Sequence, residues 1–218
     1  MDKLIRTIEN KEIIFVGNSI EILQHKKGEW IDSHDIVVRF GKGYPTEDKW
    51  ESIGSRTDIW ISGFLRSKHQ VYYPDSIKLL NRARVDLDSD VSRHKIGNDW
   101  ITMFSDYELK TIYEEFGIKN NDFHAKRPSN GFISILFFTR MVDVWKKLSL
   151  IGFDFFAKDA GFKVGNAVPY SWHLPINTVN ENPHMGATER GYVMDLVRKN
   201  ILDWKILSDL EEKSVDFT

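Results

Sequence analysis

The sequence predicts an α/β domain of Rossmann-like type, in which a mainly parallel sheet is flanked by helices. Three observations support this fold class. Short apolar runs of strand length alternate with helical patterns along the chain. Hydrophobic residues make up 41% of the 218 residues, which is enough for a sizeable core. No internal repeat, low-complexity tract or Pro/Gly/Ser-rich linker divides the chain, so residues 1–218 are expected to form a single domain.

We predict strands at five apolar runs, which span 12–16, 35–40, 57–62, 99–104 and 148–155. Helices are predicted where apolar residues recur with helical spacing, at 19–26, 45–53, 106–116, 129–147 and 189–202. The third of these helices has the clearest boundaries, because Ser105 or Asp106 can cap its start and Gly117 can end it. The stretches 63–98 and 156–188 show no clear periodicity and are predicted to be long loops.

Composition narrows the functional classes. The chain has 30 Lys and Arg against 32 Asp and Glu, a balance that argues against a dedicated nucleic-acid binder. It has no cysteine, which excludes disulfides, thiolate metal sites and cysteine nucleophiles. Charged residues interrupt every apolar run near the N-terminus, and no run approaches the roughly 20 residues of a membrane span. We therefore expect a cytoplasmic protein, and its many aromatic residues leave peripheral contact with the inner membrane face open.

The first candidate site follows the predicted strand 12–16, where the sequence reads VGNS. Gly17 permits a tight turn, and Asn18 and Ser19 then begin a helix whose N-terminal N–H groups can bind an anion. A second candidate begins the predicted helix at 129, where Ser129 is placed to cap N–H groups that can bind a carboxylate or a phosphate. Each pattern alone is also typical of an ordinary capped helix in an α/β protein.

Longer segments of the sequence carry a more specific functional signal than these two helix starts. The segment VGNSIEILQHKKGEWIDSHDIVVRFGKGYPTEDKWESIGSRTDIWI resembles, in order and spacing, the long donor-binding motif of the eukaryotic-type sialyltransferases, glycosyltransferase family 29. RPSNGFISILFFTRMVDVWKKLSLIGFDFF is similar to the family's short motif, PYSWH (169–173) to its third motif, and HMGATE (184–189) to its very short motif. The four elements extend over most of the chain. The resemblance is to a compact, soluble member of bacterial type, with a GT-A-like variant of the predicted fold.

The resemblance implies an inverting transfer of sialic acid from CMP-sialic acid to a hydroxyl of an acceptor glycan or glycolipid, without a metal or other cofactor. It implies that His184 is the general base, that His173 assists the departing phosphate, and that Glu189 has a structural role. The residues implied to bind the donor are Gly17, Asn18, Ser19, Arg39, Ser129, Asn130, Gly131 and Tyr170.

Three departures from the family pattern lead to further expectations. Gly41 stands where the family usually has Asn, so one contact to the donor is missing or is supplied by Lys42. Asn130 replaces the Thr of the short motif. Ile13 and Val142 occupy the positions of a disulfide in the animal enzymes, so we predict that their side chains are buried and in contact.

Two other functions remain open from the sequence. The motifs mainly bind the nucleotide, phosphate and carboxylate, which all CMP-nonulosonates share. CMP-Kdo or another CMP-nonulosonate is therefore an alternative donor. Gly41 also fits a non-catalytic domain that binds CMP or a partner. The acidic run DLDSD at 86–90 lies between two arginines and is interpreted as a solvated loop, so no metal site is expected.

Overall fold

The computed structural model describes residues 1–41, 43–63, 75–81, 100–117, 128–155 and 186–205 of the chain. Its strands are β1 (Glu12–Val16), β2 (Ile36–Phe40), β3 (Ile59–Ser62), β4 (Ile77–Leu80), β5 (Trp100–Thr102), β6 (Lys147–Ile151) and β7 (Asp203–Lys205). Its α-helices are α1 (Asp2–Ile8), α2 (Gly28–Asp32), α3 (Trp50–Ile53), α5 (Asp106–Glu115), α6 (Asn130–Thr139) and α7 (Gly186–Arg198). Two 3-10 helices, η1 (Ile20–Gln24) and η2 (Glu47–Lys49), complete the described elements.

The seven strands form one sheet in the order β5-β4-β3-β2-β1-β6-β7, and every pairing among them is parallel. In the register of the central strands, Phe15 of β1 lies opposite Val38 of β2 and Leu150 of β6. The predicted α/β class with a mainly parallel sheet is therefore confirmed. All five predicted strands are present, with ends that differ from the prediction by a few residues, and β4 and β7 are additional.

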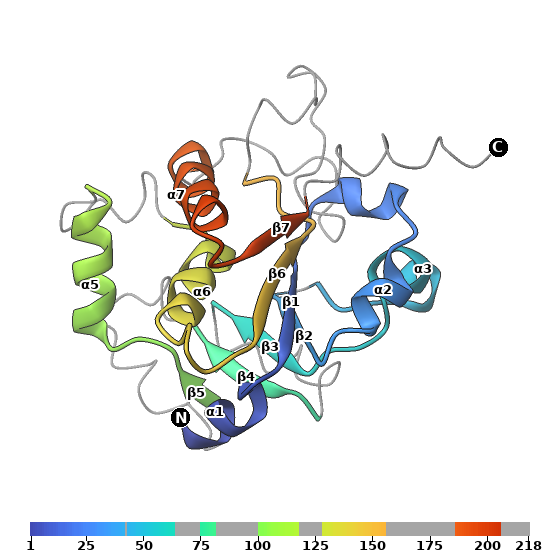
Figure 1. Ribbon diagram of the computed structural model, residues 1–218, viewed down its shortest axis with the longest axis horizontal. Coiled ribbons are helices and arrows are strands. Elements are labelled where there is room, and N and C mark those ends of the chain that lie inside the picture. The colour runs from blue at the N-terminus through green and yellow to red at the C-terminus, as the bar shows by residue number, and fades with distance from the viewer. Residues whose placement is uncertain (42, 64–74, 82–99, 118–127, 156–185, 206–218) are drawn as a thin grey trace.

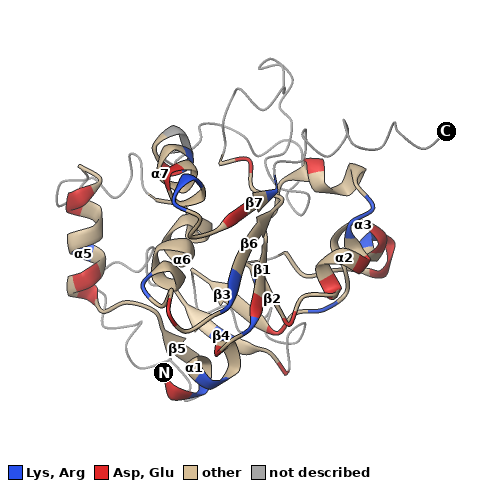
Figure 2. Cartoon of the chain, in the orientation of Figure 1, with Lys and Arg blue, Asp and Glu red and all other residues tan. Residues whose placement is uncertain are grey.

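Helices cover both faces of the sheet (Figure 1). Helices α1, α5, α6 and α7 pack on one face, where they share a large apolar cluster with the alternate strand residues Ile13, Phe15, Val38 and Leu150. Helices η1, α2 and α3 pack on the other face, over a smaller cluster that includes Ile14 and Val37. Both sets of strand side chains are buried, which explains why parallel strands read as continuous apolar runs in the sequence. Figure 2 shows acidic and basic residues interspersed over the outer helices, whereas the middle of the sheet is mostly uncharged.

The predicted boundaries of α5 are confirmed. The Ser105 hydroxyl accepts a hydrogen bond from the backbone N–H of Glu108, and the Glu108 carboxylate accepts one from the backbone N–H of Ser105. These two bonds form a capping box, and the Ser105 hydrogen bonds lower the pKa of the Glu108 carboxyl. Gly117 has a φ of 74° and ends the helix in the left-handed region that suits glycine.

The prediction about Ile13 and Val142 is wrong. Ile13 is fully buried, but the Val142 residue is 42% exposed. The reason is that α6 ends at Thr139 rather than continuing to 147, and a turn follows. In this turn Val144 and Met141 pack against the core, and the buried Trp145 ring donates a hydrogen bond to the carbonyl of Phe138 at 2.9 Å. The turn brings the chain into β6 and leaves Val142 facing solvent.

None of the helices in the described part of the chain has the length and apolar character that a membrane span requires.

Candidate functional site

The sheet reverses its direction of growth at β1, whose neighbours are β2 on one side and β6 on the other. In open parallel sheets, ligands bind beyond the carboxyl ends of the strands at such a switch point. The predicted donor segment Gly17-Asn18-Ser19 follows β1 directly at this end of the sheet. The fold therefore places the first candidate segment where α/β proteins place their ligands.

The turn after β1 is fixed against the turn after β6. The Gly17 N–H donates to the carbonyl of Ile151 at 2.8 Å, and the Ser19 N–H donates to the carbonyl of Gly152 at 3.0 Å. A Cβ atom added to Gly17 would clash with the Gly152 carbonyl group. Gly17 is thus required because two backbones approach closely, which is one of the reasons for glycine anticipated at such turns.

Asn18 and Ser19 have local partners as well. The Asn18 amide nitrogen donates to the carbonyl of Phe40 at 3.2 Å, which ties the end of β1 to the end of β2. The Ser19 hydroxyl accepts from the Glu21 N–H at 3.4 Å and caps η1, as the sequence predicted for this position. Ser19 is buried and Asn18 is half-buried.

We expect Gly17→Ala to reduce the free energy of unfolding by about 1–3 kcal/mol, because the new methyl group must displace backbone rather than a flexible side chain. Gly191→Ala is the matched control, since Gly191 lies in α7 with no atom within 4 Å of an added Cβ. That control should be stabilising by about 0.5–1 kcal/mol, because alanine is the better helix former. Urea unfolding of both variants measures the difference, and equal stabilities would contradict the close packing at Gly17.

The second candidate segment begins α6. Ser129 caps this helix, and its hydroxyl accepts from the Phe132 N–H at 3.1 Å, as predicted. Asn130 and Gly131 lie in the first turn of α6. The backbone N–H groups of a first helical turn have no acceptor within the helix. A Cβ on Gly131 would lie 2.8 Å from Cε1 of the Phe153 ring, just after β6. The helix start therefore lies against the segment that also fixes the Gly17 turn.

Phe153 connects the two candidate segments. Its ring is close to Gly131 on one side and forms an edge contact with Phe40, at 5.7 Å between ring centroids. Phe40 in turn accepts the hydrogen bond from Asn18. Both sets of predicted donor-binding residues thus lie at the carboxyl end of the sheet around one aromatic pair. N–H groups at two helix starts are suited to hold the anionic groups of a nucleotide.

Glu189 is the residue whose partner the sequence did not identify. It lies in the first turn of α7, is only 1% exposed, and accepts two hydrogen bonds from Ser129. The Ser129 N–H donates to Oε1 and the Ser129 hydroxyl donates to Oε2, each at 2.7 Å. These two bonds are consistent with a structural role for Glu189. They connect the first turn of α7 to the capping residue of α6, which is 60 positions earlier in the sequence.

Arg39, which the resemblance implies as a donor-binding residue, has partners within the fold. The side chain is 1% exposed and lies beneath α3, where Nε donates to the carbonyl of Arg56 at 2.8 Å and a terminal nitrogen donates to the carbonyl of Ile53 at 2.6 Å. A buried guanidinium needs such acceptors, and here the loop after α3 provides them. Arg39 joins β2 to this loop within the fold.

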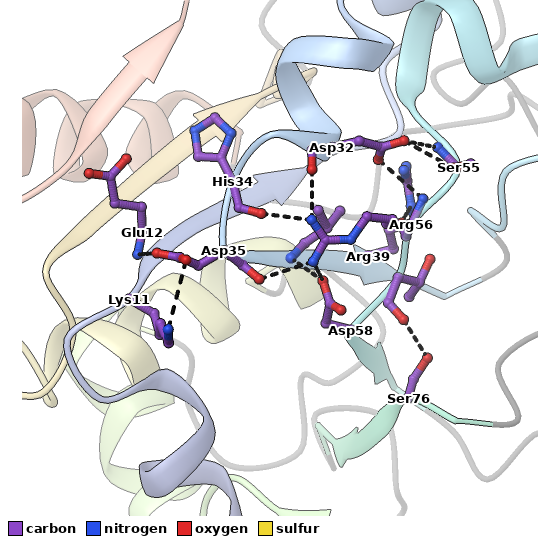
Figure 3. Close-up of polar contacts among 12 residues, drawn as sticks. Lys11, Glu12, Asp32, His34, Asp35, Arg39, Ser55, Arg56, Asp58 and Ser76 are labelled. Atoms are coloured by element: carbon purple, nitrogen blue, oxygen red, sulfur yellow. Dashed lines mark hydrogen bonds and ion pairs between the residues drawn. The ribbon is translucent and has the colours of Figure 1, made fainter.

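Several other charged residues of the long motif also make contacts within the fold (Figure 3). The Asp32 carboxylate accepts from the backbone N–H groups of Ser55 and Arg56, at 2.7 and 3.1 Å. The Arg56 guanidinium donates to the carbonyls of Asp32, His34 and Asp35 and pairs with Asp58 at 3.0 Å. These residues lie between α2, α3 and the amino ends of β2 and β3, at the edge of the sheet opposite to the candidate site. The VGNS segment and the end of β2 at Phe40 are the parts of the long motif that lie at the carboxyl edge near the candidate site.

Gly41 has a φ of 57°, and nothing lies within 4 Å of an added Cβ. Left-handed backbone favours glycine and, among other residues, asparagine. The residue found here and the Asn of the family pattern therefore suit the same backbone conformation. The Gly41 carbonyl accepts from the indole N–H of Trp60 at 2.8 Å. Lys42 lies outside the described residues, as do His184, His173 and Tyr170.

No family model matches the chain. It is 26% identical over 211 residues to the pig (Sus scrofa) CMP-N-acetylneuraminate-beta-galactosamide-alpha-2,3-sialyltransferase 1, with 87% of this chain and 53% of the pig protein aligned. The chain thus spans about half the length of this curated relative.

Two crystal structures of a mammalian sialyltransferase share the fold. One, in complex with Gal-beta-1-3GalNAc-ortho-nitrophenol, matches with a TM-score of 0.58 and 19% identity over 92% of this chain and 71% of that one. The other matches with a TM-score of 0.55 and 19% identity over 90% and 69% of the two chains. This chain is therefore similar in sequence to a sialyltransferase and shares the fold of sialyltransferase structures.

Proposed function

We propose that this protein is an inverting, metal-independent glycosyltransferase that moves sialic acid from CMP-sialic acid to a hydroxyl of an acceptor glycan. The observation that carries the proposal is the meeting of two donor-type segments at the switch point of the sheet. Gly17-Asn18-Ser19 and Ser129-Asn130-Gly131 lie there around Phe153 and Phe40. The relationship to the sialyltransferases supports CMP as the nucleotide that these segments bind.

In the proposed transfer, His184 and His173 have different roles. His184 takes the proton of the acceptor hydroxyl as its oxygen attacks the anomeric carbon of the sugar, because a His with an ordinary pKa near 6.5 is largely neutral at neutral pH. The bond from that carbon to the phosphate oxygen breaks, and CMP leaves with the electron pair. Attack opposite to the leaving phosphate inverts the anomeric configuration. His173 hydrogen bonds to the phosphate and stabilises the charge that develops on it.

The place of His184 in the sequence, shortly before α7, supports this role. His184 is five positions before Glu189 in the sequence, and the Glu189 carboxylate is bonded to the cap of α6. The start of α7 is therefore anchored to one of the two segments proposed to bind the donor. This arrangement is suited to an enzyme in which the base and the donor-binding groups must keep a fixed geometry.

A ligand-binding test addresses the nucleotide. CMP should raise the melting temperature of the protein by several degrees at concentrations about 100-fold above its Kd, since binding to the native state alone stabilises it by about 2.7 kcal/mol there. UDP at the same concentration should raise the melting temperature far less. Differential scanning fluorimetry measures both, and equal shifts from CMP and UDP would contradict a CMP-specific site.

A turnover test addresses the reaction and the donor. With CMP-sialic acid and CMP-Kdo offered in parallel, release of CMP in the presence of an acceptor identifies the sugar that is transferred. Among the described residues, no cluster of three or more His, Asp or Glu side chains is arranged to hold a metal ion. We expect EDTA to leave the rate unchanged, and a rate that is lost with EDTA and restored by a divalent cation would overturn the metal-independent mechanism. CMP binding with no turnover of any CMP-sugar would favour a non-catalytic CMP-binding domain.

A further inference from the structure

Two asparagines meet at the carboxyl edge of the sheet, and one of them lies outside every motif of the sequence. Asn81 directly follows β4, is 1% exposed, and its backbone N–H donates to the carbonyl of Ser62 at 2.8 Å. Its side-chain nitrogen Nδ2 donates to Oδ1 of Asn130 at 3.4 Å. A buried residue at the end of a strand thus touches the side chain that opens α6.

Gly63 completes the arrangement. It follows β3, and a Cβ atom added there would lie 2.6 Å from Nδ2 and 2.8 Å from Oδ1 of Asn130. Both distances are shorter than real Cβ atoms show, so any side chain at this position would displace the Asn130 amide. The flat amide therefore lies against the bare backbone of Gly63 while Asn81 contacts its oxygen.

This contact sets which end of the Asn130 amide remains available. A side-chain amide has an acceptor oxygen and two N–H donors. Asn81 donates to that oxygen, and no other described residue accepts a hydrogen bond from Nδ2 of Asn130. Asn130 is half-buried in the first turn of α6, beside N–H groups that favour an anion. The N–H donors of the Asn130 amide and the N–H groups at the start of α6 therefore both favour an anionic oxygen.

We propose that Asn81 is a positioning residue, which turns the Asn130 amide so that its N–H donors face an anionic oxygen of the sugar-nucleotide donor. The inference rests on the proposed function, because it concerns the site of the CMP-sugar. The group that Asn130 binds is a phosphate or a carboxylate oxygen, and a CMP-nonulosonate carries both. Asn81 acts through Asn130 and does not itself touch the donor.

A double-mutant cycle separates this role from a general structural one. Asn130→Ala removes the donor group and should weaken the binding of CMP-sialic acid about 10-fold, as expected for a hydrogen bond to a charged group. Asn81→Ala should weaken binding by roughly 3- to 10-fold, because the amide is then free to turn. The double variant should bind no more weakly than Asn130→Ala alone. Isothermal titration calorimetry with CMP and with CMP-sialic acid gives the four dissociation constants for each ligand.

Additional variants keep the test decisive. Asn81→Leu retains the approximate size of the side chain but can neither donate nor accept a hydrogen bond, so it should weaken binding by the same roughly 3- to 10-fold as Asn81→Ala does. It also replaces the alanine variant in the cycle if that variant does not fold, as judged by circular dichroism. Ser76→Ala is the matched control, because it removes a 2.8 Å hydrogen bond to the Thr57 carbonyl near the opposite end of β4. The control should bind as the wild type does.

The outcomes are distinct. If CMP loses affinity in step with CMP-sialic acid, Asn130 binds the phosphate, and if only CMP-sialic acid does, it binds the carboxylate. Independent effects of the two substitutions would overturn the positioning role of Asn81 while leaving the proposed function intact. If the wild-type protein binds neither ligand, the proposed function fails and this inference fails with it.

Discussion

His184→Ala should lower kcat by about 10²–10⁴-fold while leaving the Kd for CMP nearly unchanged, because a general base acts on the transition state and not on nucleotide binding. Steady-state kinetics with CMP-sialic acid and a verified acceptor measure kcat, and calorimetry measures the Kd. His25→Ala is the matched control, since His25 lies after η1 and has no proposed part in the reaction. Its kcat should equal that of the wild type.

The dependence of the rate on pH tests the same assignment more directly. A general base must be unprotonated to accept the acceptor proton, so the wild-type rate should fall as the pH drops below the pKa of His184. This acidic limb should disappear in His184→Ala and remain in His25→Ala. If His184→Ala keeps full activity, the loop that contains it is not catalytic, and the relationship to the sialyltransferases then supports nucleotide binding alone.

Most of the sheet was predictable because buried parallel strands leave a strong apolar signal. The run EIIFV became β1 with the boundaries that the sequence predicted, and β2, β3, β5 and β6 lie within or beside the predicted runs. The two strands that the sequence did not reveal are short, and β7 forms one edge of the described sheet. β4 carries Lys78 among its four residues, and β7 has three residues with Trp204 between two charged neighbours. Such segments are defined by their neighbours in the sheet rather than by their own pattern.

The start of α6 was predictable from nearby residues, whereas its end was not. The start of α6 was predictable because a Ser cap acts on an N–H three residues away. Its end was not, because the apolar pattern continues through Met141, Val144 and Trp145 although the chain has left the helix to reach β6. Val142 was assigned to the core because it occupies the position of a disulfide cysteine in the animal enzymes, and the turn places it in solvent.

The candidate site was likewise predictable only where a contact is local. The Ser19 and Ser129 caps depend on N–H groups two and three residues away and are visible in the sequence. Arg39 was expected to bind the donor, but its burial under α3 depends on how the sheet and that helix pack. The Asn81 contact joins positions 49 residues apart, and no periodicity or cap signals it. Polar pairs of this kind require the folded arrangement before they can be recognised.

Glu189→Ala should lower the free energy of unfolding by about 2–4 kcal/mol, because it leaves the buried N–H and hydroxyl of Ser129 without their shared acceptor. Urea unfolding gives the value. Asp195→Ala is the matched control on α7, since the side chain of Asp195 is 61% exposed and its ion pair with Arg198 is a surface one. Exposed pairs contribute little, so that control should change stability by less than about 1 kcal/mol.

Glu189→Gln removes the negative charge of the side chain but keeps its size, so its stability shows how much the charge contributes to the contact with Ser129. Glutamine keeps one oxygen for the Ser129 N–H but turns an amide nitrogen toward the Ser129 hydroxyl, which must then give up its role as donor to this partner. Its loss of stability should therefore fall between those of the wild type and Glu189→Ala. The Ser129→Ala and Glu189→Ala pair should show a coupling energy, because each substitution removes the same bond. Additive effects would mean that α7 and α6 are held together elsewhere. Coupled effects, together with weaker CMP binding in the folded Glu189→Gln protein, would show that the helix following His184 sets the position of a donor-binding segment.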